Sequence, residues 1–318
     1  MNYLEKILKN EKPHLDSQYV AIKSPCRGVF IFTPKEKSKK KILISCGIHG
    51  NETAPIEIIN DLITQIMTGT VTLAHDLMII FGNIEAMKTQ ARFLDFNLNR
   101  LFSGQWKNEP DARESKRAKE LESVTSSFFS ETSLPCLHLD LHTAIAKSHH
   151  EKFAIVPSYK DKKHSTKELA FLSSLGLDAL VMEKNTTTTF SSYTQNLFGG
   201  SGLSATVELG KVYPFGKNDR SKFTKVEDSL KRLLSQDDLP QSKITKQYFV
   251  TRTLIKDHQG YKLCLTNDDI NFTLLDTKKI LEVTLEGEQF PSKNEYIIFP
   301  NQHVKIGQRS GLIISNED

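Results

Sequence analysis

Short apolar runs alternate along this chain with longer stretches of helical periodicity. Six runs have the length and composition of strands that are buried on both faces, and they cover residues 41–47, 77–83, 136–141, 153–156, 179–182 and 204–209. Between them lie helical patterns, of which those that open at Thr53, Arg113 and Lys225 are the clearest. This alternation predicts an α/β fold in which helices pack on both faces of a mixed central sheet.

The sequence changes in character after about residue 236. Residues 237–242 form a polar segment that contains proline, and the residues beyond it show short strand patterns with almost no helical period. These strands are expected at 248–250, 263–265, 280–283, 296–299 and 312–314. We therefore expect an α/β domain over residues 1–238 and a small β-rich domain over residues 239–318. One hypothesis is that the second domain covers a site on the first.

Composition argues against several classes of protein. No apolar run reaches the roughly 18 residues of a membrane span, and the first residues lack the order of a secretory signal. The four cysteines form no CxxC pair, so reduced thiols and a cytoplasmic location are expected. The net charge is only +4, and the single dense basic run at 35–41 has no interleaved aromatic residues, which argues against nucleic acid. A small anionic substrate fits this modest charge better, whereas the oligomeric state is not predicted.

Two histidines and a glutamate have the composition of a metal site. His49 and Glu52 follow the first apolar run, and His142 follows the third. Two imidazoles and one carboxylate can bind zinc and leave an open coordination position for water. By itself the pair at 49 and 52 is equally consistent with a loop histidine and a helix-capping glutamate. Asp140 shares a strand face with His142 and either orients this ligand or is an ordinary polar residue, whereas His138 is expected to be structural.

Other polar residues also lie at or just past the predicted strand ends, where ligands gather in α/β sheets. Glu208 interrupts an apolar strand, so it is either held by charged partners or placed in a cleft as a base. The segment 92–102 contains Arg92, Asn99 and Arg100, and guanidinium groups bind carboxylates through paired hydrogen bonds. A solvated charged segment would have the same composition, so these residues alone do not decide the function.

Four motifs, taken in order, resemble the succinylglutamate desuccinylase and aspartoacylase family of zinc-dependent amidohydrolases. They are HGNETAP, RFLDFNLNRLFSG, HLDLHTA and VELGKVYPFGKND, and the resemblance runs through nearly the whole chain. The late segments INFTLLD and EYIIFPN are more similar to the desuccinylase branch. The resemblance implies a core like that of zinc carboxypeptidases, with the catalytic domain over residues 1–238. It also implies hydrolysis of N-succinyl-L-glutamate to succinate and L-glutamate, the last step of the succinyltransferase route of arginine catabolism.

The resemblance implies a role for each residue of the catalytic centre. His49, Glu52 and His142 would hold one zinc ion per subunit. Glu208 would be the base that deprotonates the metal-bound water. Arg92 would polarise the carbonyl group of the scissile amide.

Substrate recognition departs from the family pattern at one point. The resemblance implies that Asn99 and Arg100 bind a substrate carboxylate. Desuccinylases usually read TAIRxS after the zinc histidine, whereas this chain has Ala146 in place of the arginine and Lys147 one position later. Either Lys147 supplies the positive charge through a small shift of its loop, or the second substrate carboxylate is bound less tightly. A point charge does not replace a guanidinium fork without loss.

Three other functions stay open on the sequence alone. The change at Ala146 leaves room for an aspartoacylase-like deacylase of another acidic N-acyl amino acid. A zinc carboxypeptidase is disfavoured because Arg92 and Arg100 favour small acidic substrates over peptides. A non-catalytic zinc or ligand-binding protein is disfavoured because a binder needs no buried base such as Glu208.

Overall fold

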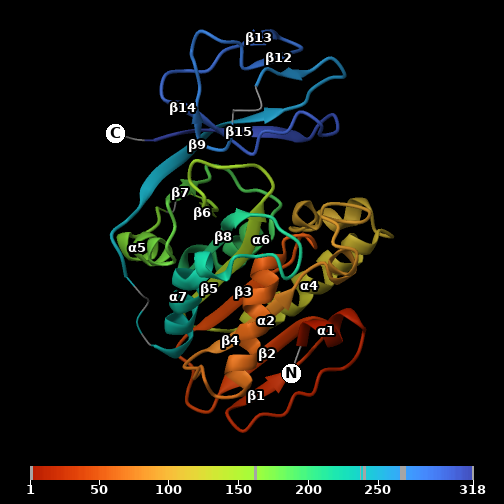
Figure 1. The fold of residues 1–318 in the computed structure, drawn as a ribbon, viewed down its shortest axis with the longest axis vertical. Helices are drawn as coiled ribbons and strands as arrows, with labels where there is room; N and C mark the ends of the chain where they lie inside the picture. The colour runs from red at the N-terminus through yellow and green to blue at the C-terminus, as the bar shows by residue number, and fades with distance from the viewer. Residues whose placement is uncertain (1–2, 161–162, 237, 239–240, 266–269, 317–318) are drawn as a thin grey trace.

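A long mixed sheet with helices on both faces forms the body of the computed structural model, which describes residues 3–160, 163–236, 238, 241–265 and 270–316 (Figure 1). Up to residue 236 the strands are β1 (Val20–Lys23), β2 (Val29–Pro34), β3 (Lys41–Cys46), β4 (Asp76–Phe81), β5 (Cys136–Ala144), β6 (Phe153–Val156), β7 (Ala179–Met182) and β8 (Gly202–Lys211). The α-helices are α1 (Tyr3–Leu8), α2 (Thr53–Met67), α3 (Ile84–Lys88), α4 (Arg113–Phe129), α5 (Thr166–Ser174), α6 (Phe190–Phe198) and α7 (Thr224–Ser235). None of the described helices has both the length and the apolar character needed to cross a membrane. The predicted mixed α/β architecture is confirmed.

The C-terminal strands extend the same sheet. They are β9 (Lys246–Ile255), β10 (Lys262–Leu263), β11 (Thr273–Leu274), β12 (Glu282–Thr284), β13 (Gly287–Gln289), β14 (Glu295–Ile298) and β15 (Arg309–Ser315). The strand order is β1-β2-β4-β3-β5-β8-β6-β7-β9-β15-β14-β11, while β10, β12 and β13 form a small sheet of their own. β9 pairs in parallel with β7 and antiparallel with β15, so backbone hydrogen bonds join the β-rich part to the α/β part (Figure 1). Part of the polar segment predicted at 237–242 lies outside the described residues, namely residues 237, 239 and 240. Residue 239, the first of the predicted second domain, is one of them.

The alternation of side chains along the central strands divides the apolar core between the two faces of the sheet. Ile42 of β3 packs in a cluster with α2, α5 and α7, whereas the next residue, Leu43, packs in a cluster with α4 and α6. β5 is buried along its whole length, because β3 and β8 flank it and helices cover both of its faces. His138, Asp140 and His142 project from the face of β5 that carries α6, since the ring of His138 contacts that helix.

Two central strands run further than the sequence predicted. β5 was expected to end at Leu141 but continues to Ala144, and β8 continues to Lys211. His142 therefore lies inside β5, and the prediction that it follows the end of its strand is wrong, whereas Glu208 lies inside its strand as the apolar run 204–209 predicted. The reason is the parallel ladder between the two strands, whose backbone pairing continues past these polar residues.

Candidate metal centre

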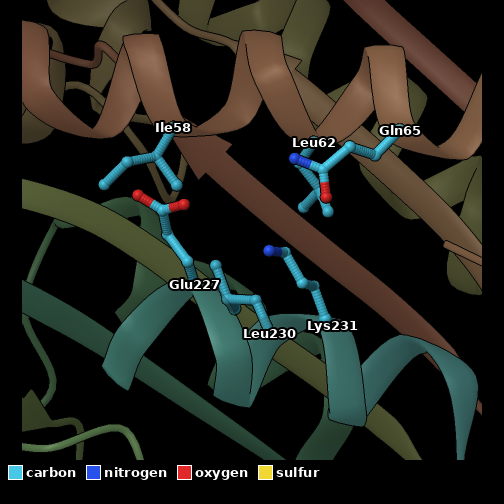
Figure 2. Close-up of a pocket in the computed structure, with 6 residues that line it drawn as sticks. All are labelled: Ile58, Leu62, Gln65, Glu227, Leu230 and Lys231. Atoms are coloured by element: carbon cyan, nitrogen blue, oxygen red, sulfur yellow. The ribbon is translucent and has the colours of Figure 1, made fainter. Parts of the chain in front are cut away.

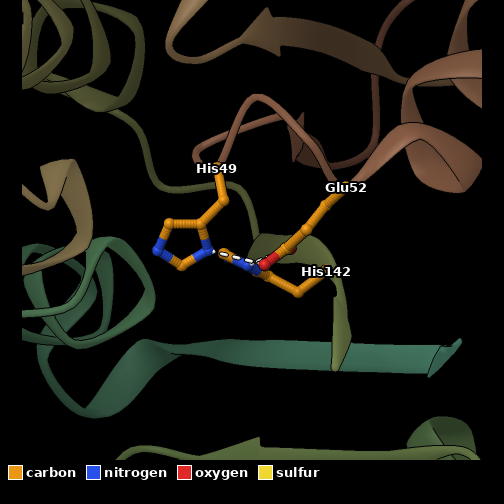
Figure 3. Close-up of side chains that lie close together, drawn as sticks. All are labelled: His49, Glu52 and His142. Atoms are coloured by element: carbon orange, nitrogen blue, oxygen red, sulfur yellow. Dashed lines mark hydrogen bonds and ion pairs between the residues drawn. The ribbon is translucent and has the colours of Figure 1, made fainter. Parts of the chain in front are cut away.

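His49, Glu52 and His142 come together near the C-terminal ends of the central strands β3 and β5 (Figure 3). His49 lies in the loop after β3, Glu52 directly precedes α2, and His142 lies on β5. Nδ1 of His49 is 2.8 Å from Oε1 of Glu52, and Nδ1 of His142 is 2.9 Å from Oε2 of the same carboxylate. The candidate ligand atoms all lie within 4.8 Å of one another, and the three residues are buried. The trio singled out in the sequence is thus a spatial cluster.

Two glycines let the loop that carries His49 pack tightly against α3. Gly47 has a φ of +63°, and a Cβ atom there would lie 2.0 Å from the end of the Met87 side chain. A Cβ atom on Gly50 would lie 2.2 Å from the backbone carbonyl carbon of Ala86. Any other residue at 50 would force the loop away from α3, so glycine is required for the position of His49.

The carboxylate of Glu52 faces the centre of the cluster and does not cap α2. Glu52 occupies the N-cap position of this helix, but its side chain makes no capping hydrogen bond. Its oxygens instead accept hydrogen bonds from Nη1 of Arg92 at 2.8 Å and from the backbone N–H of Thr143 at 3.0 Å. Burial by itself raises the pKa of Glu52, but His49 and His142 outweigh it and hold this pKa well below its ordinary value. The helix-capping interpretation is therefore wrong, and the carboxylate is charged.

Asp140 orients His142. Nε2 of His142 lies 2.9 Å from Oδ2 of Asp140, whose Oδ1 accepts a hydrogen bond of 2.5 Å from the hydroxyl group of Ser45. Burial by itself lowers the pKa of His142, but the carboxylates of Asp140 and Glu52 raise it well above its ordinary value. The cluster therefore favours a positive charge at this point. A carboxylate behind a histidine is also the usual way to fix the ring of a metal ligand.

Asn97 orients His49, a contact that no sequence pattern indicated. Nε2 of His49 lies 2.9 Å from Oδ1 of Asn97. The same oxygen accepts a hydrogen bond of 3.0 Å from the backbone N–H of Asn99, so Nε2 of His49 is the donor. Burial lowers the pKa of His49 to about 4, so the ring is neutral near pH 7 and its lone pair lies on Nδ1.

The atoms that face the centre of the trio fit a divalent cation. Nδ1 of His49, Nδ1 of His142 and both oxygens of Glu52 converge there, while the outer ring nitrogens face Asn97 and Asp140. These groups need positive charge between them, which a proton on His142 supplies by itself and which a bound cation would supply in its place. Two imidazoles and one carboxylate, each ring fixed from behind, form a donor set that suits zinc and leaves a coordination position open.

Glu208 lies beside this cluster on the neighbouring strand. It is the register partner of His142 in the parallel pair of β5 and β8, so the two side chains project from the same face. Glu208 is only 7% exposed, and its Oε2 atom has no hydrogen-bond partner among the described residues. Burial, together with the negative charge of Glu52, raises the pKa of Glu208 to about 7. A carboxyl group with a pKa near neutrality can both accept and return a proton, as a general base requires.

The predicted substrate residues of the segment 92–102 have distinct surroundings. Arg92 contacts Glu52 and keeps 34% of its side chain exposed, so its other N–H groups can reach a ligand. Asn99 is buried, and its side-chain oxygen accepts a hydrogen bond of 2.9 Å from the backbone N–H of Phe190. Arg100 donates to the backbone carbonyl of Asn99 at 2.8 Å and keeps an exposed surface, although its guanidinium group lies among protein groups.

Lys147 lies in the loop that follows β5, where its side chain is exposed. Its backbone carbonyl accepts a hydrogen bond of 3.0 Å from Asn271, and Ser148 forms an isolated parallel bridge with Asn271. The loop that carries Lys147 is therefore tied to the C-terminal strands.

A recess between α2 and α7 is lined by none of these residues (Figure 2). Its lining residues are Ile58, Leu62, Gln65, Glu227, Leu230 and Lys231. The recess has a volume of only ≈ 10 Å³, which is about the space that one water molecule needs. It is too small to be a substrate site.

Replacing Asn97 by alanine is expected to lower zinc affinity by about 10- to 100-fold, because His49 loses the group that fixes its ring. Asn97→Asp keeps an acceptor for both the ring and the backbone of Asn99, so its affinity is expected to stay near that of the unmodified protein. Competition with a chromogenic chelator measures both constants, and Asn108→Ala, at an exposed position, is the control. Equal zinc affinity in Asn97→Ala and the control would contradict the orienting role.

Known proteins are similar to this chain over most of its length. The model of the succinylglutamate desuccinylase/aspartoacylase catalytic domain matches residues 38–234, and the model of the AstE/AspA barrel-sandwich hybrid domain matches residues 243–317. A succinylglutamate desuccinylase of Photorhabdus laumondii is 39% identical over 91% of this chain and 90% of its own length, and one of Pseudoalteromonas atlantica is 41% identical over 93% and 86%. The crystal structure of the succinylglutamate desuccinylase from Chromobacterium violaceum superimposes with a TM-score of 0.87 at 32% identity, covering 100% of this chain and 98% of that one. This chain is therefore a member of the succinylglutamate desuccinylase/aspartoacylase family.

Proposed function

We propose that this chain hydrolyses N-succinyl-L-glutamate to succinate and L-glutamate and that it uses one zinc ion per subunit. The observation that carries this proposal is the register pairing of Glu208 with His142, which sets an acid of raised pKa beside the trio. The names of the relatives supply the substrate, because they are succinylglutamate desuccinylases at 39% and 41% identity. The reaction would be the last step of arginine catabolism through succinylated intermediates.

His49, Glu52 and His142 would hold the zinc ion, which when bound supplies a Lewis acid that acidifies water and polarises a carbonyl group. Glu208 accepts a proton from the attacking water. It then donates this proton to the amine nitrogen of the leaving glutamate, so its carboxyl group begins and ends the cycle in the same state. The raised pKa of Glu208 suits this exchange near neutral pH.

Arginine and amide groups around the centre would bind the substrate. Arg92 donates hydrogen bonds to the oxygen of the scissile carbonyl, where negative charge develops as the water attacks. The guanidinium group of Arg100 and the amino group of Asn99 bind a substrate carboxylate. Lys147, which is exposed in the loop after β5, would supply a further positive charge to the substrate.

A deacylase of another acidic N-acyl amino acid is the second candidate, and Ala146 in place of the family arginine is the feature that favours it. The zinc-loaded protein is to be assayed for release of free amine from N-succinyl-L-glutamate, N-acetyl-L-aspartate, N-acetyl-L-glutamate and a peptide library. We expect the kcat/KM for N-succinyl-L-glutamate to exceed the others by at least about 10-fold, since one more carboxylate contact contributes 1.5–3 kcal/mol. Preference for N-acetyl-L-aspartate would establish the second candidate instead.

A further inference from the structure

Arg309, the first residue of β15, lies on the side of the sheet that carries Glu208. Its guanidinium group lies over the ring of Phe299, 5.6 Å from the ring centroid. The ring of Phe299 is 5.7 Å from that of Phe153. Phe153 on β6 is the antiparallel register partner of Glu208 on β8, so these two side chains project from the same face of the sheet. Contacts through the ring of Phe299 therefore connect Arg309 to Phe153, which lies beside Glu208.

Arg309 also lies close to the arginines of the segment 92–102. Burial lowers the pKa of Arg100 to about 9, and among neighbouring charges that of Arg309 adds most to this effect. Burial lowers the pKa of Arg309 as well, with Arg92 adding to the effect and Glu183 and Glu208 opposing it. Arg100 nevertheless keeps an exposed surface, and Arg309 is half-exposed. Arg100 and Arg309 are therefore both packed among protein groups and both reached by solvent.

The positive charges of Arg100 and Arg309 have no ion-pair partner within the described part of the chain. Among the described residues, neither Arg100 nor Arg309 forms an ion pair with an aspartate or glutamate. The negative charge of Glu183 opposes the lowered pKa of both arginines, but burial raises the pKa of Glu183 to about 7 despite them, so this acid is only partly ionised at neutral pH. Two guanidinium groups that lie near each other repel, and a carboxylate bound between them offsets this repulsion.

We propose that Arg309 is a specificity-determining residue that binds a carboxylate of the substrate together with Arg100. The C-terminal strands thereby contribute a side chain to the substrate site and do more than cover it. This inference rests on the proposed function, because N-succinyl-L-glutamate carries three carboxylates and Arg309 would share with Arg100 the one that is assigned to Asn99 and Arg100. The guanidinium group of an arginine is planar, has five N–H donors and can bind a carboxylate through two parallel hydrogen bonds. The same carboxylate can also accept hydrogen bonds from a second arginine.

The test compares Arg309→Met with the unmodified protein on four substrates. These are N-succinyl-L-glutamate, N-succinyl-L-glutamine, N-succinyl-L-isoglutamine and N-butyryl-L-glutamate, and each of the last three lacks one carboxylate. We expect Arg309→Met to lower kcat/KM for N-succinyl-L-glutamate by about 10- to 100-fold, mainly through KM, at unchanged zinc content. The same substitution should have almost no further effect on the one analogue that lacks the carboxylate bound by Arg309.

Matched variants separate this role from a structural one. Arg309→Lys should keep part of the kcat/KM that Arg309→Met loses, because lysine supplies the positive charge but not the paired hydrogen bonds of a guanidinium group. Lys305→Met removes an exposed positive charge from the same C-terminal region and should leave all four rates unchanged. Equal losses on all four substrates, or no loss on any, would overturn the role of Arg309 while leaving the proposed function intact.

Binding of the two reaction products to the zinc-loaded protein tests the role of Arg309 independently of catalytic activity. Succinate and L-glutamate are expected to raise the melting temperature of the zinc-loaded protein, and at least one of them should do so less in Arg309→Met. An unmodified protein that hydrolyses none of the substrates would contradict the proposed function. Equal shifts by both ligands in the two proteins would contradict carboxylate binding by Arg309.

Discussion

Glu208→Gln is expected to lower kcat by about 10²- to 10⁴-fold, the usual contribution of a positioned general base. Glutamine has nearly the same shape as glutamate but cannot accept a proton from water. The variant should keep its zinc, because Glu208 is not one of the three clustered ligands. Removing a buried carboxyl group with an unpartnered Oε2 should leave the fold as stable as before or more so. Steady-state release of glutamate and elemental analysis of the same sample measure both quantities.

Glu151→Gln is the matched control for this loss. Glu151 is an exposed glutamate whose partner, Lys222, is also exposed, so its replacement should leave kcat unchanged. A Glu208→Gln variant that turns over substrate at the rate of this control would show that another group moves the proton. Loss of zinc in Glu208→Gln would instead place Glu208 among the ligands.

His142→Ala is expected to abolish zinc binding at one equivalent per chain and, with it, the hydrolytic activity. The variant removes one of the three proposed ligand side chains and the positive partner of two buried carboxylates, Glu52 and Asp140. Leaving such charges uncompensated costs about 3–5 kcal/mol of folding stability. Elemental analysis after dialysis gives the zinc content, and urea denaturation of the metal-free proteins gives the free energy of unfolding.

His14→Ala, at an exposed position, is the control for the loss of a histidine. It should retain one zinc per chain and the stability of the unmodified protein. Retention of a full equivalent of zinc in His142→Ala would remove His142 from the ligand set. If His142→Ala loses zinc but its metal-free form is as stable as the unmodified metal-free protein, then His142 does not compensate the charges of Asp140 and Glu52.

The candidate site was predictable to the extent that its residues have local signatures. His49 and Glu52 stand three residues apart after an apolar run, and Asp140 and His142 share a strand face through simple alternation. Glu208 was recognisable as an acid within an apolar strand. Asn97 and Arg309 were not recognised, because an asparagine in a polar segment and an arginine at the start of a strand resemble many surface residues. Their positions beside His49 and Phe299 arise only from contacts between distant segments.

The sequence by itself determined the secondary structure of the central sheet, because apolar runs and helical periods are local consequences of which side chains must be buried. Only the tertiary structure decided the strand order and the register that sets His142 beside Glu208. It also decided the pairing of β7 with β9 and of β9 with β15, which places Arg309 in the same sheet as Glu208. The physical reason is that a strand pattern specifies which face is buried but not which strand pairs with it. That choice depends on the packing of segments tens of residues apart.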